Sequence, residues 1–414
     1  LGVPISFCIG IATIITMLLS IKTAPALTTV AQRMATGLDS FALLAIPFFI
    51  LSGQLMNRGG IARRLIDFAK VLVGMLPGGL AYVNILAAML FGAISGSAVA
   101  AAAAIGGFMI PLMNDEGYDR NFSAAVNITS ATTGLLIPPS NILIVYSLAS
   151  GGTSIAALFL AGYIPGFIVG AALMIISGVF AYRNKYPVGA RVSLKEAIKR
   201  FFDSLPSLFL LIIVIGGIVA GFFTATEASA IAVFYTFILS VIIYREVKWK
   251  ELPKILLDST STTAIVMLLI GTSMGMSWIM SYENIPQNVS AALISLTENR
   301  IIILLIINLI LLFVGTFMDM TPAVLIFTPI FLPVVVQLGM DPVHFGIIMI
   351  LNLCIGLCTP PVGSVLFVGC GIANTSVVKV IKPILPLFIA MVASLLLITY
   401  LPELSLALPR LFGF

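Results

Sequence analysis

The chain has 414 residues, of which 60% are hydrophobic and only 9% are charged, and its mean hydropathy is +1.18. Soluble domains carry about 25% charged residues, so the composition excludes an ordinary soluble protein and indicates an all-α polytopic membrane protein. The net charge of +5 does not indicate a nucleic-acid partner, because membrane topology explains its distribution. The cysteines show no metal-type clustering, and we expect buried free thiols at Cys8, Cys354, Cys358 and Cys370.

The N-terminal part contains two apolar runs, at 1–21 and 39–56. Both are predicted spans, since about 20 apolar residues cross a hydrocarbon core of roughly 30 Å. The chain opens without a charged n-region or a cleavage site, so we expect no signal peptide. At 58–70, apolar and charged residues alternate at helical spacing, which is typical of a helix in the membrane interface. Residues 1–75 are therefore predicted to be scaffold spans and a cytoplasmic arm helix.

The next apolar segment, 76–113, has a polar, glycine-bearing middle at Ser95-Gly96-Ser97. It is too long for one crossing and too short for two, so we predict a re-entrant hairpin. The following segment, 121–150, contains the stretch 134–141, Gly-Leu-Leu-Ile-Pro-Pro-Ser-Asn. Two prolines in a row cannot continue a helix. We therefore predict a broken helix here and then a span at 155–182, which complete a first repeat at 76–182.

A charged stretch at 183–203 precedes two spans that are joined at 224–227, Thr-Ala-Thr-Glu, where the spacing predicts a capping box. A further span at 255–280 and a second amphipathic arm at 287–297 complete a scaffold part at 183–299. The second repeat, 300–382, contains a hairpin at 300–338 with its polar tip at 315–322, and a broken helix at 343–372. A last span at 384–401 leaves an outer C-terminus, within a final part at 383–414.

An internal duplication relates the two repeats. Gly134 and Gly356 are 222 residues apart, and the same offset pairs Gly117 with Gly339 and Asp119 with Asp341. Irregular backbone at membrane depth is tolerated only where protein buries it or where it lines a cavity. Two breaks at matching positions of two repeats therefore predict a transporter binding site near the midplane.

The basic residues predict the topology. Nine crossings and two hairpins place 17 of the 21 basic residues on one side, and Lys22, Arg33, Arg300 and Arg410 on the other. The positive-inside rule then puts the N-terminus in the cytoplasm and the C-terminus outside. The same count makes the two hairpins enter from opposite sides, so the repeats are predicted to be inverted.

Asp319 is the acid inside the second, otherwise apolar hairpin, and an unpaired carboxylate at that depth costs several kcal/mol. No Lys, Arg or His lies between Arg300 and Asp341, so we expect a bound alkali cation to compensate it. The alternative is a carboxylate that caps the second half of the hairpin. In the first hairpin Ser97 stands where the second has Asp319, and small residues there could instead serve close helix packing. The candidate sodium ligands are Ser95, Ser97, Thr133, Gly134, Ile137, Gly315, Thr316, Asp319, Gly356 and Thr359.

A substrate would meet the tips and the breaks, where half-helix N-termini present free N–H groups to an anion. The candidate substrate ligands are Ser97, Ser140, Asn141, Thr321, Gly363 and Ser364. No basic residue lies in either break. His344, the one histidine, is interpreted as structural. The sequence has no Walker motif or catalytic set, so it predicts no enzyme, no ATP-driven transport and no cofactor other than sodium as a coupling ion.

The chain resembles the large membrane subunit of tripartite ATP-independent periplasmic (TRAP) transporters, including their sialic-acid branch. The resemblance is carried by Phe91 to Ser97, by the two breaks and by Gly221 to Ala228. It implies a sodium-coupled elevator-type importer of a small organic acid, such as sialic acid, in the bacterial inner membrane. It also implies a small membrane subunit and a periplasmic substrate-binding protein as partners, and a Leu1 that starts inside the first span.

Two other classes stay open at this point. A binding-protein-independent sodium/dicarboxylate-type elevator would share the hairpins and the breaks, and transport with and without periplasmic protein would separate the two. A polytopic membrane enzyme would need clustered His, Asp or Glu at one depth, which the sequence does not show.

Overall fold

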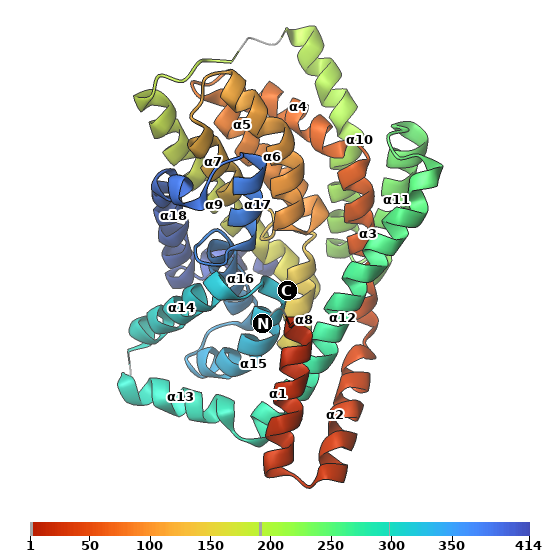
Figure 1. The fold of residues 1–414 in the computed structure, drawn as a ribbon, viewed down its shortest axis with the longest axis vertical. Coiled ribbons are helices and arrows are strands. Elements are labelled where there is room, and N and C mark those ends of the chain that lie inside the picture. The colour runs from red at the N-terminus through yellow and green to blue at the C-terminus, as the bar shows by residue number, and fades with distance from the viewer. Residues whose placement is uncertain (1–2, 190–192, 298) are drawn as a thin grey trace.

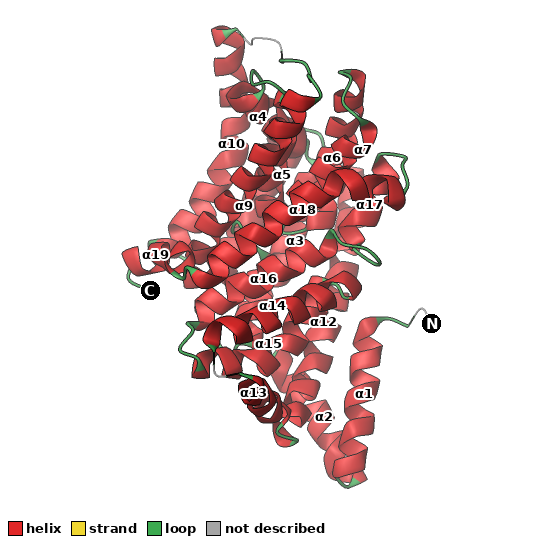
Figure 2. Cartoon of the chain, turned by 90° about the vertical axis from the view of Figure 1, so that its left-hand side faces the viewer, coloured by secondary structure: helices red, strands yellow, loops and turns green. Residues whose placement is uncertain are grey.

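The computed structural model describes residues 3–189, 193–297 and 299–414. Leu1, where the first predicted span begins, and Arg191, one of the 17 basic residues predicted on the cytoplasmic side, lie outside them. Within the described residues the chain is helical, apart from one isolated bridge between Pro77 and Val188. Figure 2 shows loops only as connections between helices, and it places the two ends of the chain on opposite sides of the molecule.

The N-terminal helices form a long edge of the molecule (Figure 1). α1 and α2 pair with each other, α2 leads through a short 3-10 turn into α3, and all three helices pack on α12. The hydrophobic pattern does not predict α2, because its threonines and polar residues do not make an apolar run. These elements are α1 (Ile5–Ser20), α2 (Thr23–Leu38), η1 (Phe41–Leu44), α3 (Ala45–Arg58) and α4 (Ile61–Val73).

The helix α4 differs from the predicted interfacial arm. Its apolar face, with Ile61, Leu65 and Ile66, is buried against α5 and α10, while Arg63 is exposed. The amphipathic pattern predicts the helix correctly. The partner of its apolar face is protein, because a period of 3.6 residues cannot distinguish a lipid surface from a neighbouring helix.

The first repeat contains the predicted hairpin and broken helix. The hairpin α5–α6 turns at 96–97, and α7 and α8 are separated by the irregular segment 134–140. A single long helix then follows, as predicted for the span at 155–182. The elements are α5 (Gly79–Ser95), α6 (Ala98–Asp115), α7 (Arg120–Thr133), α8 (Asn141–Ala149) and α9 (Ile155–Arg183).

The middle part begins after the α9–α10 connection. The predicted capping box is confirmed, since Thr224 and Glu227 exchange both of its hydrogen bonds at the start of α11. The second arm, α13, packs against α15. The elements are α10 (Leu194–Val219), α11 (Ala225–Phe237), η2 (Ile238–Ile243), η3 (Trp249–Glu251), α12 (Leu252–Tyr282) and α13 (Ile285–Leu296).

The second repeat has the same order of elements. Its last long helix starts at Val377 and not at 384, because Lys379 and Lys382 lie in exposed helical turns and not in a connection. The expected boundary at 382/383 thus falls inside one helix, and an unpredicted helix, α19, packs on α9. The elements are α14 (Arg300–Phe317), α15 (Met320–Gln337), α16 (Pro342–Leu357), α17 (Ser364–Ile372), α18 (Val377–Tyr400) and α19 (Glu403–Leu411).

The two repeats interlock. The hairpin α5–α6 lies in the upper half of Figure 1 and the hairpin α14–α15 in the lower half. α8 packs on α15, and its counterpart α17 packs on α6. Each half-helix after a break therefore contacts the hairpin of the other repeat, and the duplicated halves share one continuous apolar core. This inverted arrangement brings both tips and both breaks to the middle of the molecule.

Candidate functional site

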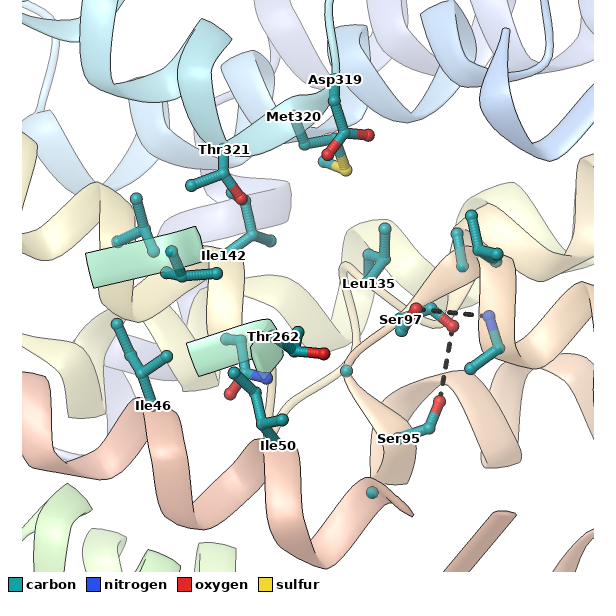
Figure 3. A pocket seen from close by; sticks show the side chains of 18 of the residues that line it. Ile46, Ile50, Ser95, Ser97, Leu135, Ile142, Thr262, Asp319, Met320 and Thr321 are labelled. Atoms are coloured by element: carbon teal, nitrogen blue, oxygen red, sulfur yellow. Dashed lines mark hydrogen bonds between the residues drawn. The ribbon is translucent and has the colours of Figure 1, made fainter. Parts of the chain in front are cut away.

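A cavity of about 280 Å³ lies where the two hairpin tips meet the start of α8 and the second helix break. Figure 3 shows it between the second tip, with Asp319 and Thr321, and the first tip, with Ser95 and Ser97. Helices α3 and α12 close the remaining side. The cavity therefore has walls from both repeats and from the helices around them.

The first tip is built by a tight turn. Gly96 has a φ of +63°, in the left-handed region that favours glycine, and a β-carbon there would lie 3.1 Å from Asn141 Nδ2. Ser97 Oγ accepts a hydrogen bond from the Ala100 N–H at 3.2 Å and so caps α6. The turn thus holds two serines against the start of α8.

The second tip carries the charge. Asp319 occupies the N-cap position of α15, as Ser97 does for α6, but its side chain makes no capping hydrogen bond. The carboxylate is exposed and points into the open space of the cavity (Figure 3). Asp319 therefore occupies the N-cap position that the capping alternative predicts, but its side chain does not make the capping hydrogen bond. Its oxygens are directed toward whatever fills the cavity.

The breaks place polar atoms without partners near the cavity. Among the described residues, Ser140 Oγ, Asn141 Oδ1 and Ser364 Oγ are buried and have no hydrogen-bond partner. A buried polar atom that lacks a partner costs about 1–3 kcal/mol. Asn141 and Ser364 both line the cavity, each as the first residue of a half-helix. A bound polar solute could satisfy these two.

Glycines bring each hairpin against its own break. A β-carbon on Gly134 would lie 2.4 Å from Gly92 Cα, and one on Gly356 would lie 2.4 Å from the Gly315 carbonyl carbon. In the second repeat the Val362 N–H also donates to Thr316 O at 3.3 Å. The backbones therefore touch, and carbonyl groups of the tip lie beside those of the break.

The threonine hydroxyls in these contacts donate their protons to carbonyl groups of the preceding helical turn. The hydroxyls of Thr133, Thr316 and Thr359 donate to Ser130 O, Phe313 O and Ile355 O at 2.6, 2.7 and 2.8 Å. A hydroxyl that donates to its own helix keeps oxygen lone pairs free to accept a bond or to coordinate a cation. Neutral oxygens with free lone pairs are suitable ligands for a hard cation.

The structure divides the predicted site residues into two groups. Six of them line the cavity: Ser95, Ser97, Asn141, Asp319, Thr321 and Ser364. The others lie in the contacts behind it or in the breaks, and do not line it: Thr133, Gly134, Ile137, Ser140, Gly315, Thr316, Gly356, Thr359 and Gly363.

The cavity wall formed by α3 and α12 was not predicted from the sequence. Gln54 and Asn57 line the cavity from α3, and Thr262 lines it from α12. A signal for the first two exists in the sequence, because they lie three residues apart at the end of a largely apolar run. The cavity is thus more polar on this side than the hairpins alone predict.

Two further expectations concern histidine and cysteine. His344 is 1% exposed, and its Nε2 lies 3.3 Å from Thr399 O, away from the cavity, in agreement with a structural role. Cys8 is exposed, so the expectation of a buried thiol is wrong there, while the other three cysteines are buried and free. Among the described residues no group of three or more His, Cys, Asp or Glu side chains could hold a metal ion.

Comparison with known proteins gives a consistent picture. Residues 1–404 match the family described as "Tripartite ATP-independent periplasmic transporter, DctM component". The uncharacterized protein YgiK of Salmonella typhimurium is 59% identical to this chain, and the alignment covers 100% of this chain and 94% of YgiK. The C4-dicarboxylate TRAP transporter large permease protein DctM of Rhodobacter capsulatus is 38% identical, with 100% and 96% covered. The sialic acid TRAP transporter large permease protein SiaM of Vibrio cholerae is also 38% identical, with 99% and 96% covered.

A solved structure shares the fold. The YdaH transporter of Alcanivorax borkumensis superimposes with a TM-score of 0.67 at 13% identity, covering 91% of this chain and 88% of that one. At this identity the likeness concerns the fold alone. It agrees with a multi-pass membrane protein, and nine helices of the described residues are long and apolar enough to cross a bilayer.

Proposed function

Since the chain belongs to the DctM component family of tripartite ATP-independent periplasmic transporters, we propose that it imports a small organic anion in symport with sodium by an elevator mechanism. The observation that carries the proposal is the cavity between the two tips. It joins an uncapped carboxylate, Asp319, with unpartnered polar atoms of Asn141 and Ser364. None of the residues that line it is basic. An anion would then be held by half-helix N-termini, by amide and hydroxyl groups, and by the bound cations.

Sodium would bind behind the tips, once in each repeat. The first site would use Ser95, Ser97, Thr133, Gly134 and Ile137, and the second would use Gly315, Thr316, Asp319, Gly356 and Thr359. The close backbone contacts at Gly134 and Gly356, and the hydroxyl lone pairs left free by Thr133, Thr316 and Thr359, support these sites. A cation between a tip and a break would also fix the tip, which couples sodium binding to the shape of the cavity.

The moving part would consist of residues 76–182 and 300–414, and the scaffold of residues 1–75 and 183–299. The predicted boundary at 382/383 is not kept, because α18 continues across it and both α18 and α19 pack on α9 and α16. The interlocking of α8 with α15 and of α17 with α6 supports movement of both repeats as one body. The positive-inside rule gives a cytoplasmic N-terminus and a periplasmic C-terminus in a bacterial inner membrane. A small membrane subunit and a periplasmic binding protein would be the partners.

The substrate class follows from relatives. Their names include C4-dicarboxylate, sialic acid and isethionate transporters, all of which carry organic anions. Since the dicarboxylate and the sialic-acid relatives named above are equally similar to this chain, identity does not select the sialic-acid branch. The isethionate relative of Oleidesulfovibrio alaskensis is named DctMQ, and this chain covers 64% of it, which fits a second membrane component fused to the first.

Reconstitution tests the proposal. The chain would be placed in liposomes with an inward sodium gradient, alone and with the small subunit and the binding protein of the same transporter. Uptake of succinate, N-acetylneuraminate and isethionate would then be measured. We expect sodium-dependent uptake of one of these anions. We expect it with the complete system and not with the chain alone. Uptake by the chain alone at the same rate would favour the binding-protein-independent elevator, and uptake that ignores the sodium gradient would refute the coupling.

A further inference from the structure

We propose that the ion pair of Arg58 and Asp258 controls the electrostatics of a polar exit lane that leads out of the cavity along α3 and α12. The inference rests on the proposed function for its cargo, a small organic anion. The lane would be formed by polar side chains of the two helices, Gln54 and Asn57 of α3 and Thr262 of α12. It would be the place where the anion meets a fixed positive charge.

One face of α3 changes character along its length. Ile46 and Ile50 line the cavity near the start of the helix, and Gln54 and Asn57 line it near the end. Arg58 is the last residue of the helix and lies four positions after Gln54, which places the two on one face. The wall thus runs from apolar through amide groups to a guanidinium.

The facing helix α12 repeats the same order. Val266 and Thr262 line the cavity, and Asp258 lies four positions before Thr262, on the same face. Arg58 Nη2 lies 2.6 Å from Asp258 Oδ2, so the two charged ends meet. Both polar faces therefore lead from the cavity to one ion pair.

Arg58 is distinguished from the other cations of the chain by its position. It is the one Lys or Arg that lies within four positions of a residue lining the cavity. The cavity wall holds no basic residue, so an anion leaving along this wall would meet Arg58 as its first cation. Asp258 neutralises much of this charge. The pair would attract the anion weakly and release it, whereas a free arginine would retain it.

A purely structural brace is the competing explanation. Packing already holds the two helices together at this level, because Leu55 of α3 and Ile255 of α12 are 2% and 0% exposed within one apolar cluster. The ion pair lies outside that cluster, and its side chains are 34% and 39% exposed. Ion pairs with this exposure contribute about 0–1 kcal/mol to stability. The position of the pair, beside the polar lining, is therefore better explained by the electrostatics of the lane.

The test uses reagents in place of an unidentified solute. Gln54→Cys would be introduced after replacement of the native cysteines, and the thiol would be modified with an anionic and a cationic methanethiosulfonate, applied from each side of the membrane in turn. The ratio of the anionic to the cationic modification rate reports the local electrostatic potential at the thiol, because a change in thiol reactivity affects both rates equally. We expect modification from one side only. Asp258→Asn should raise the anionic-to-cationic ratio roughly tenfold, and Arg58→Ala should lower it by a similar factor.

Two controls sharpen the result. The double variant Arg58→Ala with Asp258→Asn should restore the ratio, since it removes both charges, and Glu403→Gln in the distant pair with Arg410 should leave it unchanged. A ratio that stays within twofold of the parent in both single variants would overturn the proposal. So would the loss of folded protein in both single variants and in the double variant, which would identify a brace, because each of the three removes the ion pair. Because no transported solute is used, failure of the proposed transport function would leave this result interpretable.

Discussion

Asp319 and Ser97 occupy equivalent N-cap positions in two related hairpin tips, but only Ser97 caps its helix. The free carboxylate at the second tip is costly at membrane depth unless a cation compensates it. At the N-cap position the two tips therefore differ in charge. This difference makes the second repeat the stronger candidate for cation binding.

We predict that Asp319→Asn keeps the protein folded but lowers sodium-dependent uptake on the order of ten- to hundredfold, the loss of one charge-assisted contact. Uptake against sodium concentration in proteoliposomes measures it. The matched control is Asp341→Ala, which removes a genuine cap, the bond from the Val343 N–H to Asp341 Oδ1 at 2.7 Å. The control should cost about 1 kcal/mol of stability and retain the sodium dependence. Unchanged sodium dependence in Asp319→Asn would contradict the second cation site.

Gly134 gives a second prediction at this scale. Gly134→Ala would place a β-carbon 2.4 Å from Gly92 Cα, a backbone atom that cannot move aside, so we expect destabilisation of about 1–3 kcal/mol or more. Thermal unfolding in detergent would show it as a lower midpoint. Gly107→Ala is the control, because a β-carbon there meets nothing within 4 Å and the residue lies inside α6. An equal midpoint for the two variants would mean that hairpin and break do not touch.

At the scale of elements, the connection after α9 fastens the base of the first hairpin. Tyr186 stacks on Tyr118 with ring centroids 4.3 Å apart, and its hydroxyl oxygen accepts the Asp119 N–H at 3.3 Å. Pro187 O accepts the Gly78 N–H at 3.3 Å. The burial of Tyr118 raises its pKa to about 12, so this phenol stays protonated at neutral pH. The connection thus belongs to the hairpin that it covers.

We predict graded effects at Tyr186. Tyr186→Phe removes only the hydrogen bond and should cost about 0.5–1.5 kcal/mol, while Tyr186→Ala also removes the stacking and should cost about 0.5–1.5 kcal/mol more beyond the lost buried area. Limited proteolysis of the α9–α10 connection, together with the unfolding midpoint, would separate the two. Equal protease sensitivity in the parent and in Tyr186→Ala would show that stacking does not hold the connection.

At the scale of the whole molecule, the proposed elevator mechanism would let the same central cavity be reached from either side of the membrane. We predict that Ser97→Cys, in a background without native cysteines, reacts with a membrane-impermeant thiol reagent from one side or the other depending on sodium and solute. Labelling of oriented vesicles and of intact cells measures the side. Labelling from the cytoplasm alone under every condition would indicate a static structure.

The sequence by itself determined the duplication, both hairpins, both breaks and six residues of the cavity. These features are local: consecutive prolines end a helix, and glycine and serine inside an apolar run mark a turn, whatever surrounds them. Only the tertiary structure decided that α4 buries its apolar face in protein, that α2 is a helix, and that Gln54, Asn57 and Thr262 complete the cavity. The physical reason is that lipid tails and neighbouring helices are equally apolar, so a hydrophobic pattern does not show which of them a helix face contacts.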